Sequence, residues 1–262
     1  MHKIKLAFIV ISCTIMVSQS WAYDLTFSCH HFEPYVTVND KQEPQGVFVD
    51  IIHEACARVG FTCGIQLFSN RRSKAVLKTG QVNGNFPLGW NKERDQWLYW
   101  TPPLMTAEYG IFVNGEATSP PKIIEDLQGK TVGVFGPSNT SHSLKKINAS
   151  LKAASLEPFR IDMVPNEDGS NMKKLNLKRL DAVYINRDVG FYYVKKFQLK
   201  NIQYAISHRK LLYYIGFAKE HNQKELVEKF NKGIREIEEE SILLSILKKW
   251  DLTPPIKGGN IR

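Results

Sequence analysis

The stretch "SCHHFEPY" places a thiol, two imidazoles and a carboxylate within five positions, from Cys29 to Glu33. Such groups are common metal ligands. On a continuing strand, however, side chains alternate between faces, so Cys29 and His31 would share one face while His30 points away. No second Cys/His pair with zinc-like spacing occurs in the chain. We therefore expect no metal site here, and His31 is either a polar wall of a pocket or a solvated loop residue.

Two further cysteines lie in the stretch "DIIHEACARVGFTCGIQLF". Its apolar spacing predicts a helix over residues 47–59, ended by Gly60, and then a strand that starts at Cys63. A helix that turns back onto a strand brings its last turn beside the start of that strand. A disulfide between Cys56 and Cys63 would fit an oxidising compartment and contribute about 2–3 kcal/mol, whereas the alternative is two buried free thiols.

Residues 1–22 have the features of a secretory signal peptide: two lysines, an apolar run over residues 6–17 and small residues at Ser20 and Ala22. The apolar run is short for a membrane span. Cleavage as a lipoprotein before Cys13 is the alternative, but it would cut the apolar run in half. We expect export to the periplasm without a lipid anchor.

The charge of the exported chain excludes some classes of partner. Removing residues 1–22 removes two lysines and no acidic residue, which lowers the formal net charge from +9 to +7. The basic residues are interspersed with acidic ones and form no dense basic arm, so we expect neither nucleic acid nor a membrane as partner. The remaining length and 43% hydrophobic content suit two modest domains or one large one.

Short β-rich runs alternate with amphipathic helices, which is typical of parallel sheets covered by helices. The first series has strands "LTFSC", "CGIQLF" and "VNGNFPLG" with helices over 47–59 and 71–79. The second series has strands "KTVGVF", "FRIDMV" and "LDAVYIN" with helices over 141–154 and 168–178. Two helices, over 222–235 and 238–249, close the chain.

Two extended runs, "AEYGIFVNG" and "LLYYIGFAKE", connect the two series. The order predicts an α/β protein with two lobes. Lobe 1 comprises residues 23–109 and 214–262, and lobe 2 comprises residues 110–213. A cleft between two lobes is a common place for a small ligand, and the two crossings would act as hinges.

Six stretches, in order over residues 25–250, carry a resemblance to a known family. They are "FEPY…QGVFVDIIHEAC", "KAVLKTGQVNGNFPLGWNKERDQWLYWTPPL", "DLQGKTVGVFGPSNT", "RLDAVYINRDV", "YYIGFAKE" and "SILLSILKKW". The chain resembles the extracytoplasmic solute-binding proteins of polar amino-acid importers, which have the type II periplasmic binding fold. Each stretch alone is weak, but six in the family's order are specific. The pair Cys56 and Cys63 also resembles a pair in the family's basic-amino-acid and histidine binders.

The resemblance implies two groups that grip a ligand carboxylate from opposite lobes. Arg94 in "NKERDQW" matches the family's carboxylate-binding arginine, although without the family a surface arginine would be the simpler interpretation. The turn "FGPSNT" matches the family's strand-to-helix turn, so Ser138 and Asn139 would offer N–H groups and a hydroxyl at a helix start. The same residues would also suit an ordinary helix N-cap.

Several positions depart from the family's pattern. The family's ammonium-binding carboxylate is replaced by Asn186. Either Asp188, two residues along and on the same strand face if the strand continues, takes its place, or the ligand lacks an α-amino group. The small hydroxyl residues of the first lobe are replaced by Pro87, Leu88, Gly89 and Trp90. We therefore expect a more apolar and aromatic pocket, in which Trp90 either contacts the ligand or packs inside the lobe.

Two more features of the resemblance concern the cleft. In the family, the loop matched by "HHFEPY" covers the ligand, which places Phe32 or Tyr35 beside it and Glu33 at the rim. The segment "SNRRSKAV" lacks the family's tryptophan, so Arg71 or Arg72 would be the arginine near the ligand. Two arginines at the mouth would favour an acidic or dianionic solute.

Three functional hypotheses follow. The favoured one is a monomeric binding protein that closes on a small carboxylate-bearing solute, an amino acid or a similar compound, and delivers it to an ABC permease. A second is an enzyme resembling cyclohexadienyl dehydratases, with Glu33, Glu108 or Asp188 as acid or base. A third is a sensor domain, although the chain ends at Arg262 without a membrane helix or an appended enzyme domain. No phosphate-binding loop is present, and we predict no cofactor.

Overall fold

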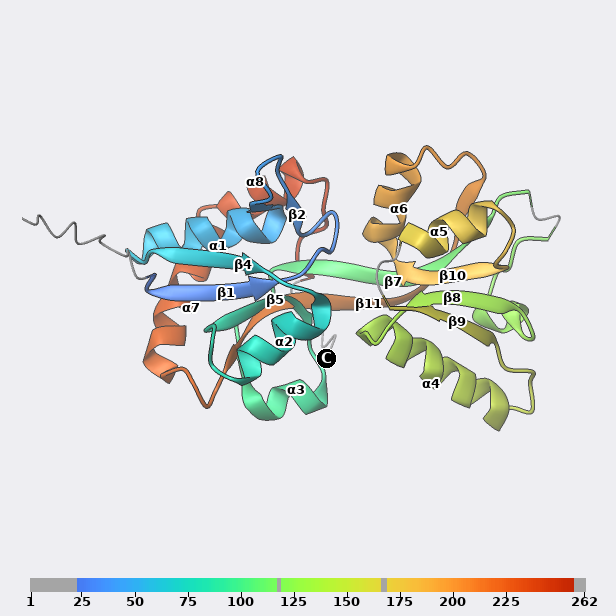
Figure 1. Ribbon diagram of the computed structural model, residues 1–262, viewed down its shortest axis with the longest axis horizontal. Helices are drawn as coiled ribbons and strands as arrows, with labels where there is room; N and C mark the ends of the chain where they lie inside the picture. Colours follow the sequence, from blue (N-terminus) through green and yellow to red (C-terminus); the bar gives the residue numbers. More distant parts are fainter. Residues whose placement is uncertain (1–22, 117–118, 166–168, 257–262) are drawn as a thin grey trace, which may run out of the picture.

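The computed structural model describes residues 23–116, 119–165 and 169–256. The predicted signal peptide and the alternative cleavage site at Cys13 lie outside the described residues. No helix in the described ranges is long and apolar enough to cross a membrane. The described chain has the predicted mixed α/β architecture, with one large sheet covered by helices (Figure 1).

The first α/β series forms one end of the molecule (Figure 1). Its parallel core is β1 (Leu25–Cys29) between β4 (Cys63–Leu67) and β5 (Gly84–Gly89). Its helices are α1 (Val47–Arg58), α2 (Asn70–Lys78) and α3 (Lys92–Trp97), and two short strands, β2 (Thr37–Val38) and β3 (Pro44–Gln45), pair with each other. The C-terminal helices α7 (Lys224–Glu239) and α8 (Ile242–Lys249) pack on α1. The helix predicted over 71–79 is confirmed as α2, whose observed bounds lie one residue earlier.

The second series forms the other end. Its strands are β8 (Thr131–Phe135), β9 (Arg160–Val164) and β10 (Ala182–Asn186), which are parallel to one another in the order β10-β8-β9. The accompanying helices are α4 (Asn139–Ala153), α5 (Gly169–Asn176) and α6 (Arg187–Lys196), preceded by a 3₁₀ turn, η1 (Ile124–Leu127). Each predicted strand and helix of this series is present within a few residues of its predicted bounds.

Two long antiparallel strands, β7 (Met105–Asn114) and β11 (Ile202–Ala218), run through both halves (Figure 1). At one end β11 pairs with β5, and at the other β7 pairs with β10. The sheet is therefore continuous in the order β4-β1-β5-β11-β7-β10-β8-β9, with β6 (Leu98–Trp100) beside β11. A Cβ at Gly110 of β7 would collide with the carbonyl of Ile206, so this close pairing requires glycine. The lobe boundaries at 109–110 and 213–214 stay predictions.

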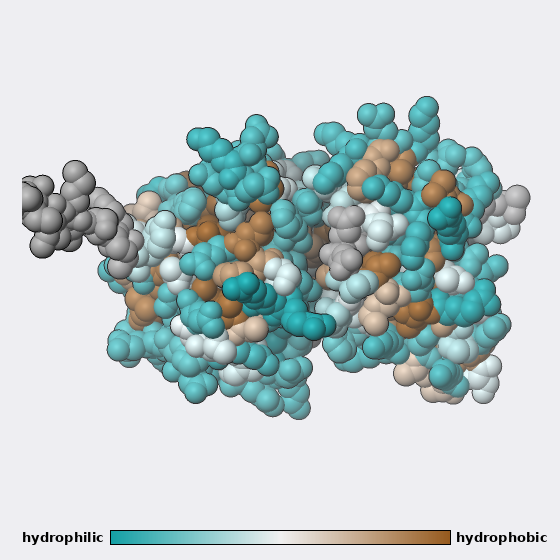
Figure 2. Space-filling model, in the orientation of Figure 1, coloured by the Kyte–Doolittle hydropathy of each residue, from teal (hydrophilic) through white to brown (hydrophobic). Residues whose placement is uncertain are grey.

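The two halves have their own side-chain layers. Between β1 and α7, Phe27 contacts Phe217 and Phe230 with ring centroids 5.6 and 5.5 Å apart. In the other half, Phe112 and Tyr184 are fully buried. Hydrophilic side chains cover most of the face shown in Figure 2, and hydrophobic ones gather in small groups over both halves.

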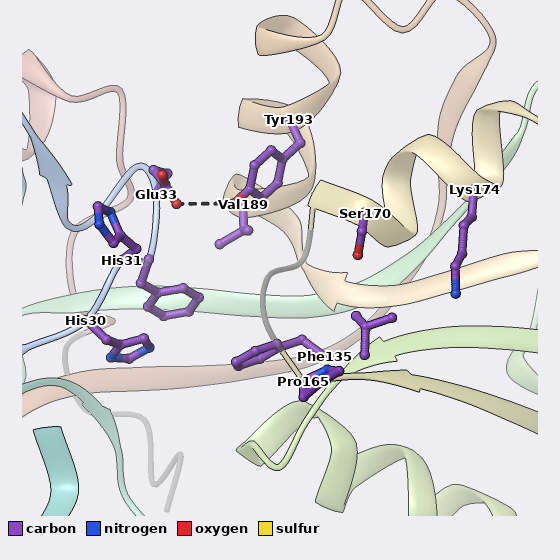
Figure 3. Close-up of a pocket in the computed structure, with 11 residues that line it drawn as sticks. His30, His31, Glu33, Phe135, Pro165, Ser170, Lys174, Val189 and Tyr193 are labelled. Carbon is purple, nitrogen blue, oxygen red and sulfur yellow. Dashed lines mark hydrogen bonds between the residues drawn. The ribbon is translucent and has the colours of Figure 1, made fainter. Parts of the chain in front are cut away.

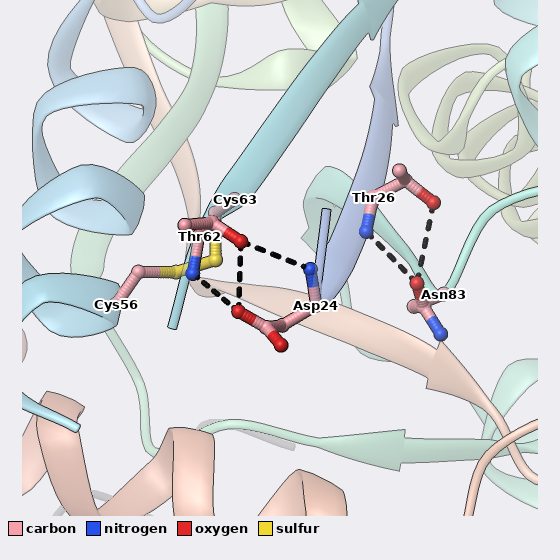
Figure 4. Close-up of a disulfide and its surroundings, with 6 residues drawn as sticks. All are labelled: Asp24, Thr26, Cys56, Thr62, Cys63 and Asn83. Carbon is pink, nitrogen blue, oxygen red and sulfur yellow. Dashed lines mark hydrogen bonds between the residues drawn. A yellow bond between two sulfur atoms is a disulfide. The ribbon is translucent and has the colours of Figure 1, made fainter. Parts of the chain in front are cut away.

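The structure places a disulfide between Cys56 of α1 and Cys63 of β4, which resolves the choice between a disulfide and free thiols (Figure 4). Next to it, the Asp24 carboxylate accepts hydrogen bonds from both the N–H and the hydroxyl of Thr62, each at 2.7 Å. The disulfide fastens the end of α1 to the start of β4, and the Asp24–Thr62 hydrogen bonds fasten the start of β1 to the start of β4. The third cysteine, Cys29, is free and fully buried, and burial raises its pKa to about 12.

Candidate functional site

Two adjoining cavities lie where the two halves meet. The inner cavity, about 60 Å³, is lined by His30, Phe32, Asn70, Lys74, Pro87, Leu88, Gly89, Arg94, Tyr109, Phe135, Ser138, Asn139, Thr140, Asn186 and Tyr213. The outer cavity, about 650 Å³, is lined by His30, His31, Phe32, Glu33, Phe135, Val164, Pro165, Ser170, Lys174, Val189 and Tyr193. Because the cavities share His30, Phe32 and Phe135, a single ligand can extend from one into the other.

Arg94 enters the inner cavity from the short helix α3. Asn91 caps this helix by accepting the Arg94 N–H at 2.8 Å, and Nη1 of Arg94 donates to the carbonyl of Gly89 at 2.8 Å. This anchor uses one of the five guanidinium N–H donors and leaves the rest of the fork available. Burial lowers the pKa of Arg94, but an arginine still carries its charge at neutral pH.

Two further basic side chains line the same cavity. Lys74 comes from α2, and burial together with the positive charge of Arg94 lowers its pKa to about 8. His30 directly follows β1, and burial, then the charge of Lys74, lowers its pKa to about 3, so its ring is neutral at pH 7. Within the described residues, the ammonium of Lys74 has no hydrogen-bond or ion-pair partner.

The start of α4 forms the opposite wall of the inner cavity. Ser138 caps this helix: its hydroxyl accepts the Ser141 N–H at 3.1 Å and lies 2.6 Å from the carbonyl of Phe135, to which it donates. The N-cap prediction for Ser138 is therefore confirmed, and its hydroxyl proton is already in use. The N–H groups of Asn139 and Thr140 have no partner among the described residues, and the start of a helix favours an anion.

Asn139 also connects the two halves of the molecule. Its Oδ1 accepts a hydrogen bond from Nδ2 of Asn91 at 3.4 Å, across the inner cavity. A Cβ at Gly89 would lie 2.8 Å from Nδ2 of Asn139, closer than real Cβ atoms approach such a group. Glycine at this position thus allows α4 to approach the end of β5.

Asn186, at the position that the resemblance assigns to the ammonium-binding carboxylate, has both its oxygen and its nitrogen bonded within the protein. It caps α6 by accepting the N–H groups of Asp188 and Val189 at 2.9 and 3.3 Å. Its Oδ1 also accepts the Tyr35 hydroxyl at 2.8 Å, and its Nδ2 donates to the Tyr213 hydroxyl at 3.2 Å. Its amide group therefore serves to hold the two halves together.

The expectation that Asp188 would share a strand face with Asn186 is wrong. Strand β10 ends at Asn186, and Asp188 lies in the first turn of α6, because the Asn186 side chain caps that helix. Its Oδ2 accepts the Tyr35 hydroxyl at 2.9 Å, and its other oxygen lies 3.7 Å from the Arg187 guanidinium. Burial raises the pKa of Asp188, against the opposing effect of the Tyr35 hydrogen bond.

The loop after β1 forms one side of the outer cavity (Figure 3). The predicted alternation of His30 and His31 is wrong, because β1 ends at Cys29 and the loop turns His30 into both cavities. His31 is exposed and still lines the outer cavity. Glu33 accepts a hydrogen bond from the Tyr193 hydroxyl of α6 at 3.1 Å, which is a second tie between the halves.

The structure brings together part of the predicted site. The inner cavity is lined by the predicted residues Phe32, Leu88, Gly89, Arg94, Ser138, Asn139 and Asn186. Four other predicted residues line neither cavity. Tyr35 is buried behind the wall, and Asp188 accepts its hydrogen bond. Arg72 is exposed, 5.2 Å from the centre of the Phe68 ring, and Trp90 donates to the Asp95 carboxylate at 2.9 Å.

Sequence reasoning missed Lys74, His30, Asn70, Tyr109, Phe135 and Tyr213. A signal for two of them was present in the periodicity of α2. Asn70 and Lys74 are four positions apart and share the helix face that turns toward the sheet with Leu77, whereas Arg72 lies on the exposed face. Within the ranges that the structure describes, no group of three or more His, Cys, Asp or Glu side chains is arranged to hold a metal ion.

Solved structures with the same fold define the class of the protein. The sensor domain of a histidine kinase, described as similar to periplasmic binding proteins, matches with a TM-score of 0.78 at 18% identity over 88% of this chain and 97% of that domain. ArtJ from Geobacillus stearothermophilus, an arginine-, lysine- and histidine-binding protein, matches with a TM-score of 0.73 at 21% identity over 88% and 96%. An ancestral arginine-binding protein bound to arginine matches with 0.74 at 22% identity over 86% and 97%. The fold is that of the type II periplasmic binding proteins.

The sequence itself identifies the family. The model of the bacterial extracellular solute-binding proteins, family 3, matches residues 26–253, and the chain belongs to this family. Membership confirms the resemblance predicted from the six stretches and a solute-binding role outside the cytoplasm. No curated protein shows significant similarity to the chain.

Proposed function

We propose that the protein captures a small carboxylate-bearing solute between its halves and delivers it, as a monomer in the periplasm, to an ABC importer. The observation that carries this proposal is the position of Arg94 opposite the start of α4, on two sides of the inner cavity. A guanidinium fork and the N–H groups of a helix start are both well suited to a carboxylate. Family membership and the amino-acid-binding proteins of the same fold support the proposal.

The proposed mechanism is closure of the two halves around the solute. Strands β7 and β11 connect the halves, so a rotation would concentrate in these two strands. The solute would complete contacts that the Asn91–Asn139 and Tyr35–Asp188 hydrogen bonds begin. Because the solute contacts both walls only when they approach, its binding favours the closed form, which the importer would recognise.

An enzymatic function on this fold has less support in the site. Each candidate acid or base, Glu33, Glu108 and Asp188, accepts a hydrogen bond from a tyrosine hydroxyl. None of the three lines the inner cavity. A general acid or base must lie within hydrogen-bond reach of the reacting group, and a solute held by Arg94 would not place its carboxylate end beside any of them.

The test is a thermal-shift screen of carboxylate-bearing solutes, followed by calorimetry. A solute present at one hundred times its Kd adds about 2.7 kcal/mol of stability, and each kcal/mol is worth about 2–4 °C in a protein of this size. We expect a rise of about 5–10 °C for the wild-type protein. Recovery of the unchanged solute after incubation would exclude turnover.

Two variants make the screen specific. Arg94→Ala should lose the solute-dependent rise while its own unfolding temperature stays close to that of the wild type, because the side chain points into a cavity. Arg179→Ala is the matched control, since Arg179 is exposed and distant from both cavities. A rise that survives in Arg94→Ala, or the absence of any responding carboxylate, would contradict the proposal.

A further inference from the structure

The inner cavity carries more positive charge than one carboxylate can balance. Arg94 and Lys74 both line it, and no aspartate or glutamate is among its described lining residues. The one protein group that Arg94 contacts there is a neutral carbonyl, that of Gly89. Lys74, which is half-buried, has no hydrogen-bond or ion-pair partner among the described residues. Buried charges are normally paired, because an unpaired one loses its hydration without compensation.

No acidic side chain among the described lining residues of the inner cavity balances the charges of Arg94 and Lys74. Glu93 and Asp95 flank Arg94 in the chain but do not line the inner cavity: Glu93 is exposed and acts on Arg94 only through its charge, and Asp95 accepts the indole N–H groups of Trp90 and Trp100. Asp188 and Glu33 are bonded to tyrosines and do not line the inner cavity either. The Asn186 amide, at the family's ammonium-binding position, has its oxygen and nitrogen occupied by protein groups. A ligand ammonium would therefore add a third positive charge beside two cations, with no carboxylate to offset it.

Two neutral polar atoms in the same cavity also lack partners. Nδ1 of His30 and Oδ1 of Asn70 are buried without a hydrogen bond among the described residues. Buried polar atoms without a partner are rare, since each costs free energy comparable to a lost hydrogen bond. Nδ1 of His30, in the tautomer that carries its proton there, and the free N–H groups at the start of α4 are donors that a compact, multiply bonded anion would satisfy. Oδ1 of Asn70 is an acceptor, which an anion does not satisfy.

We propose that the solute is a dianion that places both negative charges in the inner cavity, between Lys74 and Arg94, and carries no ammonium group there. This inference rests on the proposed function and narrows its substrate class. The inner cavity of about 60 Å³ admits only the charged head of a molecule, so the rest extends past His30 and Phe32 into the outer cavity of about 650 Å³. Two kinds of compound carry such a head: a short dicarboxylate and a phosphate monoester.

The experiment measures the Kd of defined probes by calorimetry. The probes are succinate as dicarboxylate, glycerol phosphate as phosphate monoester, butyrate as monocarboxylate, and glutamate and arginine as amino acids. We expect succinate or glycerol phosphate to bind at least tenfold more tightly than butyrate and either amino acid. Binding of succinate supports both the dianion inference and the proposed function. Binding of glycerol phosphate alone supports the dianion inference and replaces the carboxylate of the proposed function by a phosphate.

Lys74→Gln tests the second cation without removing the first. This variant should bind the dianion at least tenfold more weakly and change the affinity for butyrate less than threefold. It should unfold at no lower temperature than the wild type, because it removes an unpaired charge that is half-buried. Lys78→Gln, one turn further along α2 and exposed, is the matched control and should change neither.

The outcomes distinguish failure of the dianion inference from failure of the proposed function. If an amino acid binds more tightly than either dianion and its binding depends on Arg94, the dianion inference is overturned while the proposed function stands. Equal loss of monocarboxylate and dianion in Lys74→Gln would also overturn it. If none of the anionic probes binds at all, the dianion inference and the proposed function both fail.

Discussion

The Tyr35 hydroxyl connects the two halves through hydrogen bonds to Asn186 and Asp188, and its contribution to the unfolding free energy can be estimated. It lies 2.8 Å from Oδ1 of Asn186 and 2.9 Å from Oδ2 of Asp188, and Tyr35 is completely buried. Tyr35→Phe removes only the hydroxyl and keeps the ring against Phe48. In this variant Asn186 still accepts the N–H groups of Asp188 and Val189, so the lost hydrogen bond mainly leaves the Asp188 carboxylate without a donor.

A hydrogen bond to a charged group contributes about 1.5–3 kcal/mol net. One hydroxyl proton cannot serve both acceptors fully, so we expect a coupling of about 1–2 kcal/mol between Tyr35 and Asp188. A double-mutant cycle with Tyr35→Phe and Asp188→Ala isolates this value, because the separate effect of Asp188 on the start of α6 cancels. Loss of the hydroxyl should also raise the pKa of Asp188 further, since that bond now lowers it.

The assay is urea unfolding without solute, followed by tryptophan fluorescence and far-ultraviolet circular dichroism. Tyr99→Phe is the matched control, because the Tyr99 hydroxyl makes no hydrogen bond with the described residues and its loss should change the unfolding free energy by less than about 0.5 kcal/mol. A Tyr35–Asp188 coupling no larger than the measurement error, about 0.3 kcal/mol, would refute the assignment.

Two further predictions concern the disulfide and the pH dependence of binding. Replacing both Cys56 and Cys63, seven positions apart, by alanine should lower the unfolding free energy by about 2.5 kcal/mol from the loop-closure term, checked by urea unfolding; equal stability of variant and wild type would contradict it. For succinate, affinity should be flat from about pH 7 to 8, where both of its carboxylates are ionised, and fall by up to tenfold per pH unit above pH 8, because the free pKa of Lys74 is about 8 and a bound anion raises it. The basic groups beside Lys74 are His30, already neutral there, and Arg94, still charged, so the decline should disappear in Lys74→Gln; a decline that persists in that variant would refute the assignment.

The sequence predicted the positions of α1 and α2 well but underestimated the length of strand β11. Helical spacing of apolar residues located α1 and α2 within about one residue, since a buried face must recur with the helical period. Strand β11 begins at Ile202, well before the predicted run. Residues 207–210 of this strand are exposed and include charged side chains, and pairing with β7 rather than apolar burial holds them in place.

Sequence reasoning likewise located some residues of the site and missed others. Arg94 and the turn at Ser138 were located through the family's motifs, which fix positions along the chain. The sequence offered Arg71 or Arg72, and the place of Lys74 in the cavity depends instead on which face of α2 turns inward. The place of His30 depends on β1 ending at Cys29. The role of Asn186 could not be inferred locally, because its partner Tyr35 is 151 positions away in the sequence.

The measurement that tests the central claim most directly is calorimetric titration of the best-binding anion into the wild-type protein and into Arg94→Ala, with folding of both verified beforehand. If a solute is gripped by the Arg94 guanidinium opposite the start of α4, the variant should bind at least tenfold more weakly, as expected for the loss of a charge-assisted contact of about 1.5–3 kcal/mol. Affinities that agree within twofold would show that the solute binds elsewhere.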